Sequence, residues 1–142
     1  MMFRHRALWF SFIVCAFDLT AVAAIWLIAY AVRFNGAVPH EFWESAQRNL
    51  LWVLLLHGIV FRVFGLYRGI WVFASLPDLL RLSKAVATGA LLMMMGATLI
   101  RPAPAIPRSV FMMTPVFLLL MMGGSRALYR AAKEFYRYGG LR

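Results

Sequence analysis

Four long apolar segments, separated by short polar ones, dominate the pattern of residues along the chain. They cover residues 8–32, 49–66, 79–100 and 109–128. A bilayer core of ~30 Å requires about 20 helical residues, and three of the segments meet that length. The second segment is marginal and needs Arg62, near its far end, to extend toward the membrane surface. The pattern therefore predicts an all-α fold, an integral membrane four-helix bundle that forms a single transmembrane domain over residues 1–142, with its last helix continuing to about residue 138.

The polar segments predict where the helices are interrupted. Residues 35–39 contain Asn-Gly and a proline, which indicates a break after the first helix. Residues 40–47 combine two aromatic with two acidic residues and predict a short interfacial helix. Three prolines in residues 101–107 predict an extended loop. Residues 75–78, Ser-Leu-Pro-Asp, predict a helix start at which Ser75 caps.

The composition excludes most other classes of protein. Hydrophobic residues make up 63% of the chain and charged residues 14%, against about 45–50% and 25% in soluble domains. The first apolar segment continues to Val32, well beyond the core of a cleaved signal peptide, so it is expected to remain as a helix. The net charge of +10 comes without the motif of any nucleic-acid reader, so no nucleic acid is expected as a partner.

The distribution of basic residues predicts the topology. If the N-terminus is cytoplasmic, basic residues number eleven on the cytoplasmic side against four on the other, as the positive-inside rule requires. Both termini are therefore expected in the cytoplasm, with the chain in the inner (plasma) membrane of a bacterium. The four outer residues are Arg33, Arg48, Arg101 and Arg108.

Two kinds of polar position are candidates for function. Asp18, the one acid inside a span, and His57 are both expected near the membrane midplane, with Thr88 as a further donor. A proton or ion site is one interpretation. The other is an interhelical tie, in which Asp18 faces the bundle interior within hydrogen-bonding or one-water reach of His57 or Thr88.

The second candidate is a lipid surface. Arginine and lysine recur at three- and four-residue spacing on one face where the last helix leaves the membrane, which favours anionic lipid headgroups as partners. The glycine pair 123–124 is interpreted as a packing site for a neighbouring helix. The residues expected to contact headgroups are Arg62, Arg68, Arg126, Arg130, Lys133 and Arg137.

The chain offers no pattern typical of an active site. Its one cysteine, Cys15, lies in an apolar run, and its three histidines are too far apart in sequence to suggest a metal site. No glycine-rich phosphate loop occurs, and no nucleophile with a base lies in a water-accessible place. No catalytic residue, cofactor site or metal site is predicted.

Three stretches resemble one family in their order and spacing. They are residues 18–34, residues 64–81 with Leu-Tyr-Arg-Gly at their start, and residues 106–130, which begin with Ile-Pro-Arg-Ser. They are similar to the N-terminal membrane region of bacterial membrane-anchored nucleoside-diphosphate-sugar epimerases and 4,6-dehydratases of polysaccharide and O-antigen biosynthesis. One departure is Val72, where that family leads us to expect a basic residue.

The resemblance implies an anchor or interaction domain for an enzyme that makes capsule or lipopolysaccharide precursors. Members of that family continue into cytoplasmic Rossmann-type domains that bind NAD and a UDP-sugar, and this chain stops at about the point where they would begin. NAD is therefore expected only in a full-length relative, and no enzyme activity is expected of these residues. The lipid bilayer, anionic lipids, a second copy of the chain and glycan-assembly membrane proteins are the partners to consider.

Two alternatives remain open. The membrane region of polyprenyl-phosphate sugar-phosphate transferases has a similar four-helix plan, although the Leu-Tyr-Arg-Gly and Ile-Pro-Arg-Ser stretches favour the dehydratase branch. A small four-helix proton-coupled transporter would use Asp18 for coupling, but such a pathway normally has more polar lining than this chain offers.

Overall fold

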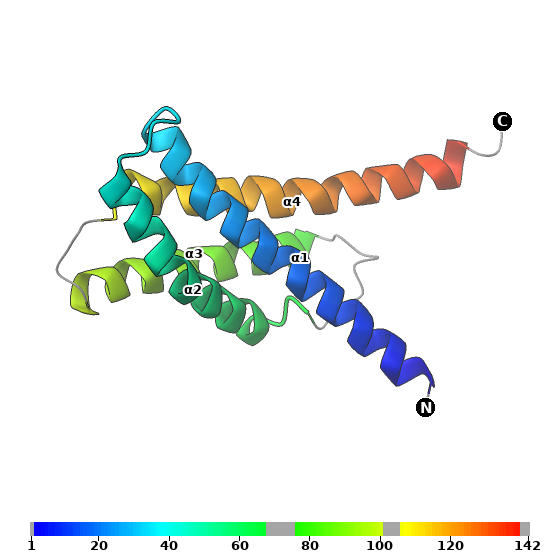
Figure 1. Ribbon diagram of the computed structural model, residues 1–142. Coiled ribbons are helices and arrows are strands. Elements are labelled where there is room, and N and C mark those ends of the chain that lie inside the picture. The colour runs from blue at the N-terminus through cyan, green and yellow to red at the C-terminus, as the bar shows by residue number, and fades with distance from the viewer. Residues whose placement is uncertain (1, 68–75, 101–105, 140–142) are drawn as a thin grey trace.

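Four α-helices form the chain in a computed structural model, which describes residues 2–67, 76–100 and 106–139. Consecutive helices contact each other, and α1 also contacts α4, so that each helix has two neighbours (Figure 1). The described residues contain no strand, which confirms the predicted all-α class. The helices are α1 (Met2–Arg33), α2 (His40–Val63), α3 (Leu76–Ile100) and α4 (Arg108–Gly139).

Three of these helices are long and apolar enough to cross a membrane, over the stretches Ser11–Arg33, Leu76–Leu99 and Arg108–Arg137. Helix α2, whose apolar part lies between Arg48 and Arg62, is not among them. The chain is therefore a membrane protein by its helices, while a fourth span at α2 stays a prediction. The first turn of α1 and the last turn of α4 lie on the same side of the molecule, here called the terminal side (Figure 1).

The break after α1 occurs where the sequence predicts it. Asn35 and Gly36 both have positive φ, at 51° and 84°, and the Gly36 amide donates to the Ala31 carbonyl at 2.7 Å. A glycine at this left-handed position closes a helix without the clash that a Cβ would bring.

Helix α2 corrects one prediction. Residues 40–47 are not a separate interfacial helix but the first two turns of α2, which begins directly after Pro39. No glycine or proline occurs after Pro39 until Gly58, so nothing interrupts the helix. The indole Nε1 of Trp26 on α1 donates to the Ala46 carbonyl at 3.0 Å and ties these turns to the core.

Some predicted features lie outside the described residues. They include the cap at Ser75, the side chain of Arg68 and most of the proline loop, residues 101–105. Helix α3 begins at Leu76, with Pro77 in its first turn as expected.

Helices α2 and α3 meet where two aromatic rings of α2 pack directly against two glycines of α3. A Cβ built at Gly96 would lie 2.5 Å from Cζ2 of Trp52, and one built at Gly89 would lie 3.1 Å from Nε2 of His57. A side chain at Gly96 would therefore overlap the Trp52 ring, and one at Gly89 would press closely on the His57 ring. This contact between rings and glycines is here called the α2–α3 seam.

Candidate functional site

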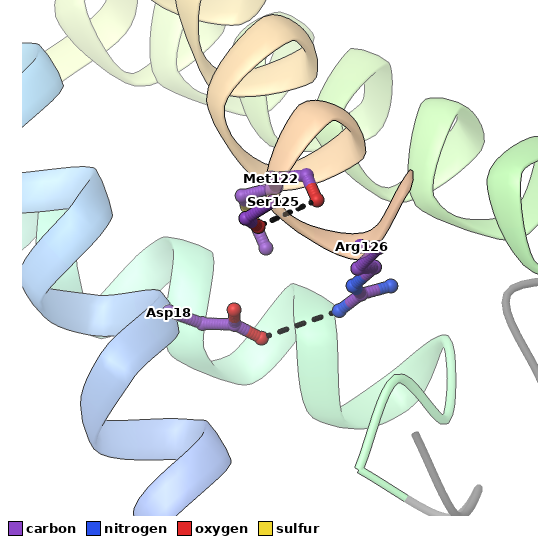
Figure 2. A network of polar contacts seen from close by, with 4 residues as sticks. All are labelled: Asp18, Met122, Ser125 and Arg126. Atoms are coloured by element: carbon purple, nitrogen blue, oxygen red, sulfur yellow. Dashed lines mark hydrogen bonds and ion pairs between the residues drawn. The ribbon is translucent and has the colours of Figure 1, made fainter. Parts of the chain in front are cut away.

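A buried ion pair joins α1 to α4. Figure 2 shows the Asp18 carboxylate on α1 pointing toward the guanidinium of Arg126 on α4. Oδ2 of Asp18 lies 3.5 Å from Nη2 of Arg126, and the two side chains are 1% and 15% exposed. Neither oxygen of Asp18 has a hydrogen-bond partner among the described residues. The charge of Asp18 is therefore balanced by Arg126 at ion-pair distance and not by a direct hydrogen bond.

The pair lies nearer the terminal side than the sequence suggested. The span Ser11–Arg33 has its centre near Val22, so Asp18 lies about one helical turn, ~6 Å, from that centre. The apolar part of α4 covers residues 109–128, and Arg126 lies near its terminal-side end. Both partners are thus displaced in the same direction, away from the most apolar depth, where an ion pair is most costly.

Tyr67, which lies after the end of α2, completes the surroundings of the pair. The hydroxyl of Ser11 donates to the Tyr67 carbonyl at 3.3 Å and fixes this residue beside α1. Burial raises the pKa of the Tyr67 phenol, the nearby Asp18 carboxylate and Cys15 raise it further, and Arg126 opposes them. The phenol therefore stays protonated, and it lies close enough to Asp18 for the charge of that carboxylate to affect the pKa of Tyr67.

The cation that faces Asp18, Arg126, is not among the partners predicted for it. Asp18 does face the interior, but no direct hydrogen bond from His57 or Thr88 reaches it. The ring of His57 is buried between α2 and α3, where Nδ1 lies 2.9 Å from the Val53 carbonyl of its own helix and the ring packs edge-on against Phe61. Thr88 is half-buried on α3. The direct contacts of Asp18 and of His57 therefore lie between different pairs of helices, and water-mediated reach from Asp18 to His57 or Thr88 stays a prediction.

This arrangement favours an interhelical tie over a proton-carrying site. Asp18 faces a fixed cation on a neighbouring helix, and separating the pair would leave a charge buried without its partner. No group of three His, Cys, Asp or Glu side chains gathers in the described part of the chain, as a metal ion would need. The chemistry that the site supports is charge pairing between two helices.

The predicted headgroup residues divide into two groups. Arg126 differs from the expectation, because its guanidinium faces Asp18 instead of the surface. Arg62, Arg130, Lys133 and Arg137 are exposed, as headgroup contact requires. Arg130 also pairs with Glu134, at 2.9 Å between Nε and Oε1.

The glycine pair on α4 also differs from its interpretation as a packing site. A Cβ at Gly124 would meet nothing within 4 Å, and one at Gly123 would make an ordinary 3.4 Å contact with Leu79. Within the described residues, neither glycine is required by a close helix contact. The close glycine contacts belong to Gly89 and Gly96, which the sequence pattern alone did not distinguish from the other glycines of the spans.

Comparison with known proteins gives one distant similarity. The chain is 25% identical over 116 residues to the capsular polysaccharide biosynthesis protein CapD of Staphylococcus aureus. The aligned part covers 78% of this chain and 19% of CapD, so the chain spans about a fifth of the length of that relative. No family model matches the chain, and no solved structure matches it. The similarity to CapD suggests a relation to a polysaccharide-biosynthesis family, as does the resemblance in the three sequence stretches.

Proposed function

We propose that this chain is the membrane anchor and interaction region of a nucleotide-sugar dehydratase or epimerase of bacterial polysaccharide biosynthesis. The similarity to CapD over most of the chain is the observation that carries the proposal. Three helices suited to span a membrane support the anchor role. The residues of the anchor would hold the catalytic part beside the lipid-linked glycan machinery, which works at the same membrane.

The proposal requires α4 to end in the cytoplasm, where NAD and UDP-sugars are found. Two observations support this side. Basic residues outnumber acidic ones by fifteen to five and concentrate at the helix ends on the terminal side. The first turn of α1 and the last turn of α4 also lie on that side (Figure 1), as an even number of membrane crossings would require.

Reporter fusions test the topology. A fluorescent protein fused after Arg142 should fold and emit light, while alkaline phosphatase fused there should be inactive. The same two reporters inserted in residues 101–107 should give the opposite result. Equal activity at both places, or the reverse pattern, would mean that the charge distribution misled us about the cytoplasmic side.

The functional test compares three forms of the gene. The full coding sequence, read beyond Arg142, should contain a strand, a Gly-x-Gly-x-x-Gly turn and a helix, and its product should convert a UDP-sugar to the 4-keto form. Deleting residues 2–142 should leave this conversion in the soluble fraction but lower the surface polysaccharide. The matched control is a protein in which an unrelated anchor of equal topology replaces residues 2–142. Full recovery of the surface polysaccharide by this control would indicate anchoring alone, whereas incomplete recovery would indicate a specific interaction of residues 2–142.

Three outcomes would contradict the proposal. A product that transfers a sugar phosphate to a polyprenyl phosphate would indicate the transferase family instead. Surface polysaccharide that is unchanged without residues 2–142 would remove the anchor role. Proton-coupled efflux by the chain in proteoliposomes, abolished by Asp18→Asn, would indicate a transporter. We expect Asp18→Asn to insert normally and to change no transport.

A further inference from the structure

The last turns of α4 carry exposed apolar and exposed basic residues side by side. All residues from 127 to 137, here called the distal segment, are exposed. The exposed fractions of Leu128, Phe135 and Tyr136 are 72%, 74% and 82%. Three basic residues accompany them, against the single acid Glu134. Only the polar face of such a helix is suited to water, and its apolar face requires an apolar partner.

The two kinds of residue occupy opposite faces of the helix. At 100° per residue, Leu128 and Phe135 lie about 20° apart, and the basic residues lie within an arc of about 60° on the far side. Tyr129 and Tyr136 fall between the two faces. An apolar face, a basic face and aromatic residues at their boundary are typical of helices that lie in a membrane interface. The basic residues are Arg130, Lys133 and Arg137.

The position of the distal segment along α4 places it where the membrane ends. Arg126 faces Asp18 within the packed helices, and the segment begins with the next residue. At ~1.5 Å per residue the segment is about 16 Å long, whereas the headgroup layer is only about 5–8 Å thick. A helix that stood upright on the membrane would carry Phe135 and Tyr136 into water. Inclination toward the surface keeps both at the lipid interface.

The helix contains a flexible point close to this boundary. Gly124 costs helix stability and serves no close contact, because the space beside it is open. The long side chain of Arg126 allows the helix to incline while the guanidinium stays at Asp18.

We propose that the distal segment lies along the membrane surface and binds anionic phospholipid headgroups. Leu128 and Phe135 face the acyl chains, and the basic residues are attracted to the phosphate layer. Charge complementarity favours lipid over a second copy of the chain, because two copies that each carry +10 repel one another. The inference needs only membrane insertion and does not depend on the assignment to polysaccharide biosynthesis.

A fluorescent probe on the distal segment tests the proposal in the full chain. Ala132, beside the apolar face, is replaced with cysteine in a Cys15→Ala background and labelled with the environment-sensitive dye NBD. The protein is reconstituted in vesicles of phosphatidylcholine, or of phosphatidylcholine and phosphatidylglycerol in equal amounts. We expect blue-shifted emission that brominated lipids quench, stronger with phosphatidylglycerol and reduced by high salt. Circular dichroism confirms that each variant is folded.

Charge variants complete the test. Each change of Arg130, Lys133 or Arg137 to glutamine should lower the ratio of surface-bound to free segment about fivefold, which corresponds to ~1 kcal/mol per basic residue. Glu134→Gln, the matched control of equal size, should keep or raise that ratio. Water-like emission in both lipids would overturn the proposal, as would emission that the triple glutamine variant leaves unchanged. An emission shift that depends on the protein-to-lipid ratio but not on phosphatidylglycerol would indicate that the distal segment contacts a second copy of the chain instead.

Discussion

The α2–α3 seam and the seam between α1 and α4 hold helices together by different means. In the first, the rings of Trp52 and His57 rest on glycines of α3, and every contact depends on shape. In the second, Asp18 and Arg126 face each other across the interface and balance two buried charges. The first seam is therefore sensitive to added atoms, whereas the second is sensitive to the loss of one charge.

The two seams therefore differ in which substitutions lower the stability of the fold. Removing one partner of a buried ion pair leaves an uncompensated charge in a medium that solvates it poorly, so the loss exceeds the net contribution of the pair. Adding a methyl group to a tight steric seam forces a ring to move, at a smaller cost. Adding the same methyl group where space is open removes only the intrinsic cost of a helical glycine.

The largest expected effect comes from Arg126→Leu. The change leaves the Asp18 carboxylate buried alone, and we expect the free energy of unfolding to fall by about 3–5 kcal/mol. Titration with sodium dodecyl sulfate in mixed micelles, followed by circular dichroism, measures it. The double variant Asp18→Leu, Arg126→Leu should recover most of the loss. The matched control is Arg130→Leu, whose exposed pair with Glu134 should cost no more than about 0.5 kcal/mol. A double variant less stable than Arg126→Leu would contradict the tie.

A smaller effect is expected from Gly96→Ala in the α2–α3 seam. The new Cβ would lie 2.5 Å from the Trp52 ring, so the ring or the helix must shift, at a cost of about 1–3 kcal/mol in the free energy of unfolding. The same mixed-micelle titration applies. Gly89→Ala, where the nearest His57 atoms are 3.1 Å away, should cost less. Trp52→Leu should make Gly96→Ala easier to accommodate. Equal costs for alanine at 89, 96 and 124 would show that shape does not determine this seam.

The smallest effect, and the only gain, is expected from Gly124→Ala. Its Cβ meets nothing within 4 Å, so alanine removes the helical cost of glycine and should stabilise the fold by up to about 1 kcal/mol. Mixed-micelle titration again measures it. A destabilised Gly124→Ala variant would indicate that a partner packs against this position.

The sequence was sufficient to predict the four helices and the break at Asn35 and Gly36. Both are marked by local signals, namely the length of an apolar segment and residues that favour a left-handed turn. The sequence misplaced the start of α2, since the aromatic and acidic residues of its first two turns differ in character from the apolar residues of the same helix. The buried contact that ties these turns to the core, from Trp26 to Ala46, joins two helices and leaves no local pattern.

The partner of Asp18 could not be predicted for a related reason. Depth counting favoured His57 because both residues were expected near the midplane, and it left out α4, against which α1 packs as well as against α2. Arg126 shares a helical face with Arg130 and was therefore grouped with the exposed residues. The two differ because Arg126 faces Asp18 of α1, and α1 and α4 diverge toward the terminal side (Figure 1).

The length of α4 has a mechanical consequence. Helix α4 has 32 residues, and Arg126 divides it into arms of about 27 Å toward Arg108 and about 20 Å toward Gly139. Helices adapt to a thinner or thicker bilayer by tilting. A tilt of about 10° about this point moves the Arg108 end sideways by ~5 Å, given the 1.5 Å rise per residue. The long arm is thus a lever with its fulcrum at the ion pair, and the flexible point at Gly124 lets its tilt follow the bilayer thickness while the distal segment stays on the membrane surface.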